Sequence, residues 1–314
     1  MKKTLFVLLK VLGIILLVII ALLVIMYAVN AVSNRSEEAK IQSYGQHVTV
    51  DGKNMNVLIQ GSGEETIVLF PGYGTAAPAL DFKPLVDELA PFYKVVVVEP
   101  FGYGLSDITE KERTIENITS ELHEALQQLK IDRYILMGHS ISGIYGLEYV
   151  NQYRNEVSAF VGIDTSVPAQ GGGEELPVDA MKMLKDSGFY RLLLKLSPDQ
   201  VIAPDVDEET KEQIRILTLR NMMNANIANE SKYFDDNFKA VEHKQFPADL
   251  PLIFFLDGSS TDVENWIPMH EEQVKDSING KVVTMEDGTH YLHHQYSKEI
   301  TEQFRAFMSE IAAD

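Results

Sequence analysis

A short stretch near the middle of the chain places a serine where it could act as a nucleophile. Residues 134–143 are Tyr-Ile-Leu-Met-Gly-His-Ser-Ile-Ser-Gly, an apolar run followed by a turn of small residues and then by helix-like sequence. A strand that turns sharply into a helix lifts the hydroxyl at the turn off the sheet edge, and backbone crowds around it. The residues two before and two after must therefore be small, and Gly138 and Ser142 meet that demand. The alternative is an ordinary turn in which Ser140 or Ser142 caps the helix.

A serine hydroxyl needs a neighbouring base to take its proton, and His290 is the candidate. An unperturbed imidazole titrates near 6.5, so it can both accept and return a proton. His293 and His294 follow closely, and such a run could bind a metal. No carboxylate pattern accompanies it, so we predict neither a metal nor a cofactor. We expect His139, beside the serine, to pack rather than react.

Composition excludes several classes of protein. The chain has 314 residues, no cysteine and a formal charge of −19. The absence of cysteine rules out disulfides and thiolate chemistry. The acidic balance argues against a nucleic-acid partner, because phosphate binding needs clustered Lys and Arg.

The N-terminal segment has the composition of a membrane anchor. Residues 11–29 include no charged side chain. A helix of this length can cross a hydrocarbon core of roughly 30 Å. Lys2, Lys3 and Lys10 precede this run, so the positive-inside rule puts the N-terminus in the cytoplasm and the remaining domain outside the cell. We predict a single-pass protein of the cell membrane, with anchor and linker in residues 1–34 and a polar linker over residues 30–43. The alternative is cleavage near Ala31, which would give a secreted protein.

The rest of the chain is strongly acidic. The first 31 residues contain three lysines and no acidic residue, so the remainder of the chain carries a net charge of −22. We therefore expect the domain not to adhere to anionic lipid surfaces except through its anchor.

The elements that must position the serine and the histidine alternate along the chain. A hairpin is predicted at residues 47–51 and 54–60, around Asp51-Gly52. Buried strands are predicted at 66–70, 93–98, 134–137, 157–163, 251–256 and 281–285, and helices at 80–89, 114–129, 144–153 and 298–311. This alternation predicts an α/β fold with a mainly parallel, doubly wound sheet, whose active residues gather at the carboxyl ends of the strands.

The alternation stops over residues 169–249, where no parallel strand is predicted. We expect a helical cap over the site, with one long helix at residues 208–226. The cap contains Met181, Met183, Met222 and Met223. These methionines either fill gaps in the core or form a flexible apolar wall for a substrate.

Order and spacing now resemble the α/β-hydrolase superfamily, from about residue 44 to the C-terminus. The resemblance rests on the elbow at Ser140, the turn Pro71-Gly72-Tyr73 after an early strand, the loop at residues 99–107 and Gly288-Thr289-His290 near the end. It implies an α/β-hydrolase domain over residues 35–314. The sequence departs from the family at Pro71, where histidine is usual, at Ser142, where glycine is usual, and at Glu99 in place of aspartate.

The resemblance also implies further roles. The oxyanion donors are the backbone N–H groups of Tyr73 and Ile141. The acid that orients the imidazole usually follows the strand at 251–256, where this chain has Ser260. Some members instead carry it after the strand that follows the elbow helix, which is Asp164 here. We favour Asp164, with Asp262 as the alternative; Asp257 and Glu264 are further candidates.

A serine rather than an aspartate nucleophile argues against dehalogenation and epoxide opening, and favours acyl transfer to water. We expect a serine hydrolase of the carboxylesterase or lipase type that cleaves a carboxylic ester of a small or medium apolar acyl group. One alternative is an aminopeptidase or amidase, in which acidic cap residues hold a substrate amine. Those residues are Glu174, Glu175, Asp205 and Asp207. The other alternative is a non-catalytic, ligand-binding member of the fold.

Overall fold

An eight-stranded sheet forms the centre of the molecule. The computed structural model describes residues 2–173, 176–197, 206–260 and 263–313. The strands are β1 (Gln46–Val50), β2 (Lys53–Gln60), β3 (Thr66–Phe70), β4 (Lys94–Val98), β5 (Tyr134–His139), β6 (Val157–Ile163), β7 (Leu252–Asp257) and β8 (Gly280–Met285). Their order is β1-β2-β4-β3-β5-β6-β7-β8; β1 and β2 pair antiparallel, as does β2 with β4, and the others run parallel. The predicted fold class is confirmed.

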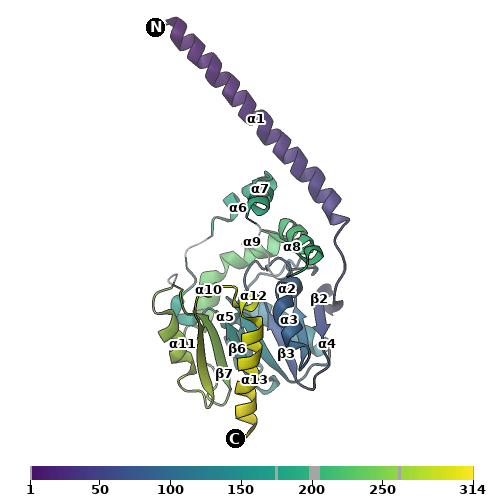
Figure 1. The fold of residues 1–314 in the computed structure, drawn as a ribbon, viewed down its shortest axis with the longest axis vertical. Coiled ribbons are helices and arrows are strands. Elements are labelled where there is room, and N and C mark those ends of the chain that lie inside the picture. The colour runs from purple at the N-terminus through teal and green to yellow at the C-terminus, as the bar shows by residue number, and fades with distance from the viewer. Residues whose placement is uncertain (1, 174–175, 198–205, 261–262, 314) are drawn as a thin grey trace.

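Helices cover both faces of the sheet, which is why its central strands are apolar throughout. On one face α4 (Ile115–Gln128) and α5 (Ser142–Gln152) pack on alternate strand residues such as Val68 and Val96. On the other face α3 (Lys83–Leu89) and α13 (Ser297–Ala313) pack on Ile67 and Leu69. Figure 1 shows α13 running along the sheet to the C-terminus. The shorter helices α2 (Pro78–Asp81), α11 (Trp266–Val274) and α12 (Leu292–Gln295) complete the core.

Two predicted helices are each divided in two. The helix predicted at residues 80–89 is α2 followed by α3, because Pro84 has no N–H to donate and is favourable only in the first turn of a new helix. The helix predicted at residues 208–226 ends earlier. Met223 takes a left-handed conformation (φ 49°), and the Asn224 side chain then caps the next helix.

Among the described residues, five α-helices lie between β6 and β7 and form the cap. They are α6 (Val178–Asp186), α7 (Phe189–Leu196), α8 (Glu208–Asn221), α9 (Ala225–Lys232) and α10 (Phe234–Val241). Figure 1 shows α6 to α9 on the side of the sheet from which α1 departs.

The N-terminal helix is longer than the sequence predicts. α1 spans Lys2–Glu38, so the polar linker predicted for residues 30–43 was wrong up to residue 38. That stretch contains no Gly or Pro to end a helix, and Glu37 forms ion pairs with Arg191 (2.7 Å) and Arg215 (2.8 Å) of the cap. By length and composition α1 could cross a membrane, and its apolar side chains are exposed.

Candidate active site

Ser140 lies at the turn between β5 and α5 in a strained conformation. Its φ is 55°, a left-handed value that is uncommon for a residue with a side chain. A Cβ on Gly138 would lie 3.0 Å from the Cβ of Ser142, so the two small residues are needed for the turn to close. Ser140 remains partly exposed to solvent, so its hydroxyl is reachable.

The structure brings Ser140, His290 and Asp164 into one chain of hydrogen bonds. His290 Nε2 lies 2.9 Å from Ser140 Oγ, and His290 Nδ1 lies 2.7 Å from Asp164 Oδ2. The Asp164 side chain is 5% exposed, whereas that of His290 is 47% exposed. In this arrangement the Nδ1–H donates to Asp164 and Nε2 is free to accept the serine proton.

The other acids proposed from the sequence lie elsewhere. The Asp257 carboxylate accepts hydrogen bonds from the backbone N–H and the hydroxyl of Ser259. Glu264 is exposed and forms no hydrogen bond with His290 in the part of the chain that the structure describes. Asp262 lies outside the described residues.

The second oxygen of Asp164 is held by groups that sequence reasoning missed. Asp164 Oδ1 accepts from the backbone N–H of Asp257 (3.0 Å) and from the indole N–H of Trp266 (3.1 Å). These donors fix the carboxylate so that Oδ2 faces the imidazole. The available signal was that Trp266, the only tryptophan of the chain, follows the loop after β7.

The expected oxyanion donors lie on two turns in close contact. A Cβ on Gly72 would lie 2.7 Å from His139 Nδ1 and 2.9 Å from Ser140 Cβ, so only glycine lets the turn before Tyr73 approach the nucleophile. Neither the N–H of Tyr73 nor that of Ile141 donates to another group among the described residues. Both N–H groups are therefore available to a ligand.

Two of the three departures from the family pattern, Ser142 and Pro71, contact each other. The Ser142 hydroxyl donates to the backbone carbonyl of Pro71. This bond ties the first turn of the elbow helix to the turn that carries Tyr73. A glycine at position 142 has no hydroxyl and could not make it.

Three buried histidines form hydrogen bonds in and next to the loop that carries His290. His139 Nε2 donates to the backbone carbonyl of His290 (2.8 Å), so His139 positions the candidate base as well as packing. Farther down, His293 and His294 each donate to one oxygen of Asp81, at 2.8 and 2.9 Å. Burial lowers the pKa of the His139 and His293 imidazoles, which are therefore neutral at pH 7.

Asp81 is therefore the carboxylate partner of His293 and His294, which the sequence pattern alone did not show. The three ligating atoms lie within 4.8 Å of one another, close enough to hold one metal ion. However, each ring N–H has its own carboxylate oxygen at hydrogen-bond distance, and the three side chains are at most 7% exposed. We interpret the cluster as a tie between α2 and α12.

Glu99 has a structural position rather than a reactive one. Its carboxylate accepts from the Tyr44 hydroxyl, the Asn56 amide and the backbone N–H groups of Ala79 and Leu105. Together these bonds shape the loop that follows β4. A Cβ on Gly104 would lie 1.8 Å from Glu99 Oε2, so the longer acid requires this glycine.

A cavity of about 90 Å³ adjoins the candidate site. Its wall includes Tyr73 from the core, Tyr190 and Met222 from the cap, and Tyr291 from the loop of His290. The four cap methionines therefore differ: Met222 faces this cavity, Met223 is buried, Met181 is partly buried and Met183 is 70% exposed.

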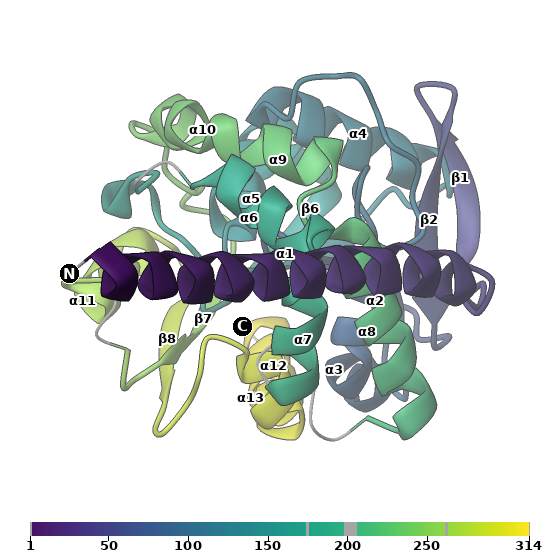
Figure 2. The same cartoon turned by 90° about the horizontal axis from the view of Figure 1, so that it is seen from above.

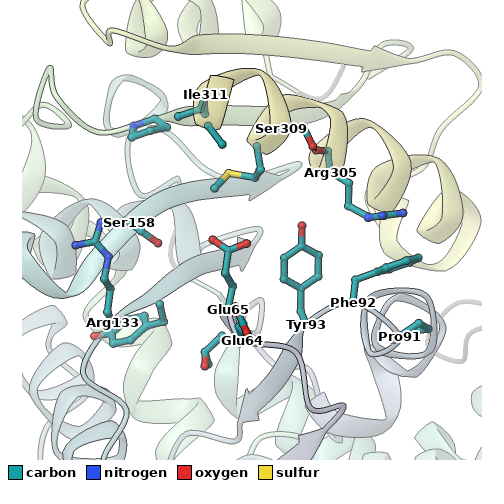
Figure 3. A pocket seen from close by; sticks show the side chains of 15 residues that line it. Glu64, Glu65, Pro91, Phe92, Tyr93, Arg133, Ser158, Arg305, Ser309 and Ile311 are labelled. Carbon is teal, nitrogen blue, oxygen red and sulfur yellow. The ribbon is translucent and has the colours of Figure 1, made fainter. Parts of the chain in front are cut away.

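A larger hollow, about 850 Å³, lies far from the chemistry. Figure 3 shows it between α13, through Arg305 and Ser309, and the loops that precede the strands, through Glu65 and Phe92. Thr66, Tyr134 and Ser158 at the start of their strands also line it. It therefore opens at the edge of the sheet opposite Ser140, and size alone does not identify the site.

The acidic cap residues proposed to hold an amine give little support to that role. Asp207 caps α8 by accepting from the N–H of Thr210. Glu174, Glu175 and Asp205 lie outside the described residues.

Comparison with known proteins identifies the family. A model described as the alpha/beta hydrolase fold matches residues 65–229. The uncharacterized protein YbdG of Bacillus subtilis (strain 168) is 31% identical over 237 residues, which is 71% of this chain and 71% of that protein. The chain belongs to the α/β-hydrolase family. The karrikin insensitive 2 receptor IA of Petunia hybrida is 29% identical over 181 residues, or 54% of this α/β hydrolase and 64% of the receptor.

Solved structures of low sequence identity share the fold. A membrane phospholipase A, described as a bacterial virulence factor, aligns over 100% of both chains with a TM-score of 0.65 and 19% identity. A bromoperoxidase from Bacillus anthracis aligns over 84% of this chain and 100% of its own, with a TM-score of 0.65 and 17% identity.

Proposed function

We propose that this α/β hydrolase is a serine hydrolase that cleaves carboxylic esters, with Ser140 as nucleophile, His290 as base and Asp164 as the acid that orients it. The observation that carries the proposal is the continuous hydrogen-bond chain from Ser140 Oγ through His290 to Asp164. The positive φ of Ser140 and the two available N–H groups support the same reaction.

The proposed mechanism has two stages. Ser140 Oγ attacks the ester carbonyl carbon while its proton passes to His290 Nε2, and the backbone N–H groups of Tyr73 and Ile141 stabilise the oxyanion. Collapse of this intermediate breaks the carbonyl–alkoxy bond, and His290 returns the proton to the leaving alcohol. A water molecule, deprotonated by His290, then attacks the acyl-enzyme; the acid leaves and the proton returns to Ser140.

The small cavity beside Tyr73 supports a preference for small or medium apolar acyl groups. Tyr190, Met222 and Ile214 line it and give part of its wall an apolar or aromatic surface. Met222 has the flexibility to adapt this wall to more than one acyl chain.

We further propose that α1 is a membrane anchor, with the N-terminus in the cytoplasm and the hydrolase domain outside the cell. The apolar run of α1 supports this placement, as does the structural similarity to a protein described as a membrane phospholipase A. The Asn30 amide donates to the backbone carbonyls of Lys185 and Asp186 in the cap. Cleavage near Ala31, the alternative, would remove these two hydrogen bonds.

A matched screen of p-nitrophenyl esters and aminoacyl-naphthylamides tests the reaction. We expect hydrolysis of short and medium acyl esters by the wild-type protein and none by the Ser140→Ala variant. Hydrolysis of the naphthylamides instead would favour the amidase alternative. A folded protein inactive on every ester and amide would contradict both.

Similarity to a receptor favours a second candidate function, binding of a small ligand without turnover. This candidate predicts that small apolar esters bind and are recovered intact. The same screen separates the two, because only the hydrolase releases p-nitrophenol.

A further inference from the structure

Exposed apolar side chains gather on two cap helices. Outside α1, most of the large apolar residues that are well exposed within the described chain belong to α6 and α7. These residues, here called the α7 apolar face, are Met183 (70% exposed), Phe189 (38%), Leu192 (45%), Leu193 (50%) and Leu196 (70%). An exposed apolar patch of this kind marks a surface that contacts another protein or a membrane.

The sequence of α7 explains why these side chains face outward. Positions 189, 192, 193 and 196 recur at helical spacing and form one stripe. Leu194 and Tyr190 lie on the opposite side: Leu194 is 5% exposed and Tyr190 lines the cavity beside Tyr73. The helix therefore has an apolar side toward the protein and a second apolar side toward the outside.

The turn before α7 lies against α1 where the uncharged run ends. The Asn30 amide donates to the carbonyls of Lys185 (3.2 Å) and Asp186 (3.3 Å). A Cβ on Gly188 would lie 3.1 Å from the carbonyl oxygen of Met26. α7 thus begins level with residues 26–30 of α1, at the expected exit from the hydrocarbon core. Figure 2 shows α7 beside α1, and Figure 1 shows α6 and α7 on the side of the domain that faces the N-terminal end of α1.

The charge around this face differs from that of the whole chain. Residues 178–196 contain four basic and two acidic side chains, whereas the chain carries −19. Lys182 and Lys195 are exposed, while Arg191 pairs with Glu37 and Lys185 donates to backbone carbonyls of the cap. An apolar helix that lacks the acidic excess of the chain suits a lipid surface. The expectation from net charge, that only the anchor meets the membrane, does not take account of this local surface.

We propose that the α7 apolar face lies in the headgroup region of the bilayer that α1 spans, as a second membrane contact. The proposal rests on the proposed anchor, because continuity with α1 identifies the bilayer as the occupant. Since Tyr190 on the other side of α7 lines the cavity, α7 also connects the lipid surface to the neighbourhood of Ser140. If the proposed hydrolase activity holds, its substrates include esters whose acyl chain lies in the bilayer.

The absence of cysteine makes a direct test possible in the full-length protein. Single cysteines are introduced at Leu193, at Leu196, at Val18 within α1 and at Ile278, an exposed position (67%) next to β8. Each variant is labelled with an environment-sensitive fluorophore and placed in phosphatidylcholine vesicles with roughly a quarter phosphatidylglycerol and added spin-labelled lipid. The readout does not depend on which way the protein inserts.

We expect quenching by the spin-labelled lipid at positions 18, 193 and 196, but not at 278. Quenching at 18 together with fully aqueous labels at 193 and 196 would overturn the docking proposal. An aqueous label at 18 would overturn the anchor, and the docking proposal with it.

An activity measurement tests the substrate class. The double variant Leu193→Glu with Leu196→Glu should hydrolyse a soluble short-chain ester like wild type, but an ester embedded in vesicles about tenfold more slowly, because two apolar contacts with the lipid are lost. Ile278→Glu is the matched control. An unchanged rate on the embedded ester would overturn delivery from the bilayer. A wild-type protein inactive on both esters would contradict the hydrolase proposal, while the quenching result would still decide the docking.

Discussion

The edge of the core that carries the candidate triad and the cap above it are held in different ways. At the core edge, hydrogen bonds from distant parts of the chain fix each candidate group, as Trp266 and Asp257 fix Asp164. In the cap, α8 to α10 are fastened to core loops through side chains that bind backbone groups. Those side chains are Asn221, Asn224, Asn226, Asn229 and Asn237. α6 and α7 instead contact α1.

One buried carboxylate connects the two regions. Glu230 of α9 accepts from the hydroxyls of Tyr103 (2.7 Å) and Tyr145 (2.8 Å), and Tyr103 in turn accepts from the N–H of Gly74 beside Tyr73. Burial raises the pKa of Glu230, although the tyrosine hydrogen bonds oppose this effect. We therefore expect substitutions at the core edge to change kcat, and substitutions in the cap to change which acyl chain the protein prefers.

The largest effect is expected at Asp164. Asp164→Asn should lower kcat by about 10⁴ without a comparable change in KM, because the imidazole is then held in the wrong tautomer. Steady-state kinetics on a p-nitrophenyl ester measure this. Asp257→Asn is the control, since it keeps the backbone N–H that binds Asp164. Near-normal turnover in Asp164→Asn would assign the role to Asp262, which Asp262→Asn would then test.

A smaller effect at the same edge is expected for Trp266→Phe. The variant keeps an aromatic ring but loses the indole N–H that donates to Asp164. We expect kcat to fall about tenfold, the effect of one hydrogen bond to a charged group, with KM unchanged. A change in KM alone would place Trp266 in substrate binding rather than in positioning.

The cap should respond through chain-length preference. Met222→Ala enlarges the cavity beside Tyr73, and each further acyl methylene that it buries is worth about 0.8 kcal/mol, or about fourfold in kcat/KM. A series of p-nitrophenyl esters should therefore show an optimum at longer chains. Met183→Ala, at an exposed position of the same cap, should leave the optimum unchanged. An equal shift in both variants would contradict the assignment of the cavity.

The smallest effect is expected in the pH dependence of stability. Burial outweighs the attraction of Asp81 and lowers the pKa of His293 in the folded chain, and burial also lowers that of His139. The unfolded chain therefore binds more protons below its histidine pKa of about 6.5, and stability is lost as the pH falls through that value.

Thermal unfolding in detergent between pH 7.5 and 5.5 measures this loss. His293→Gln should reduce the slope by up to about 1.4 kcal/mol per pH unit, the contribution of one proton. His47→Gln, at an exposed histidine, should leave the slope unchanged. Equal slopes in wild type and His293→Gln would show that His293 binds protons equally in the folded and unfolded chains, which would contradict a pKa lowered by burial.

The sequence predicted those parts of the molecule that depend on local pattern. The strands were recognisable because a sheet covered on both faces requires apolar runs, and the elbow because its turn admits only small residues at positions 138 and 142. The choice of Asp164 came from resemblance rather than from spacing. The absence of Gly and Pro over residues 30–38 favours the continuation of α1, whereas the polar composition of the same residues favours a linker; the structure follows the first signal.

Other features depend on contacts between distant residues. Asp81 and His293 lie 212 positions apart, and Trp266 lies 102 positions from Asp164. Periodicity describes one element at a time, so it cannot reveal which polar side chains meet after folding. The bond between Ser142 and Pro71 shows the same limit, since each departure from the family pattern was tolerable by itself.

Labelling with a fluorophosphonate probe, followed by peptide mapping, tests the assignment of Ser140 as the nucleophile most directly. We predict a single labelled peptide containing Ser140 in the wild-type protein, and no label in Ser140→Ala. A folded wild-type protein that takes no label, or a label that persists in Ser140→Ala, would contradict the assignment.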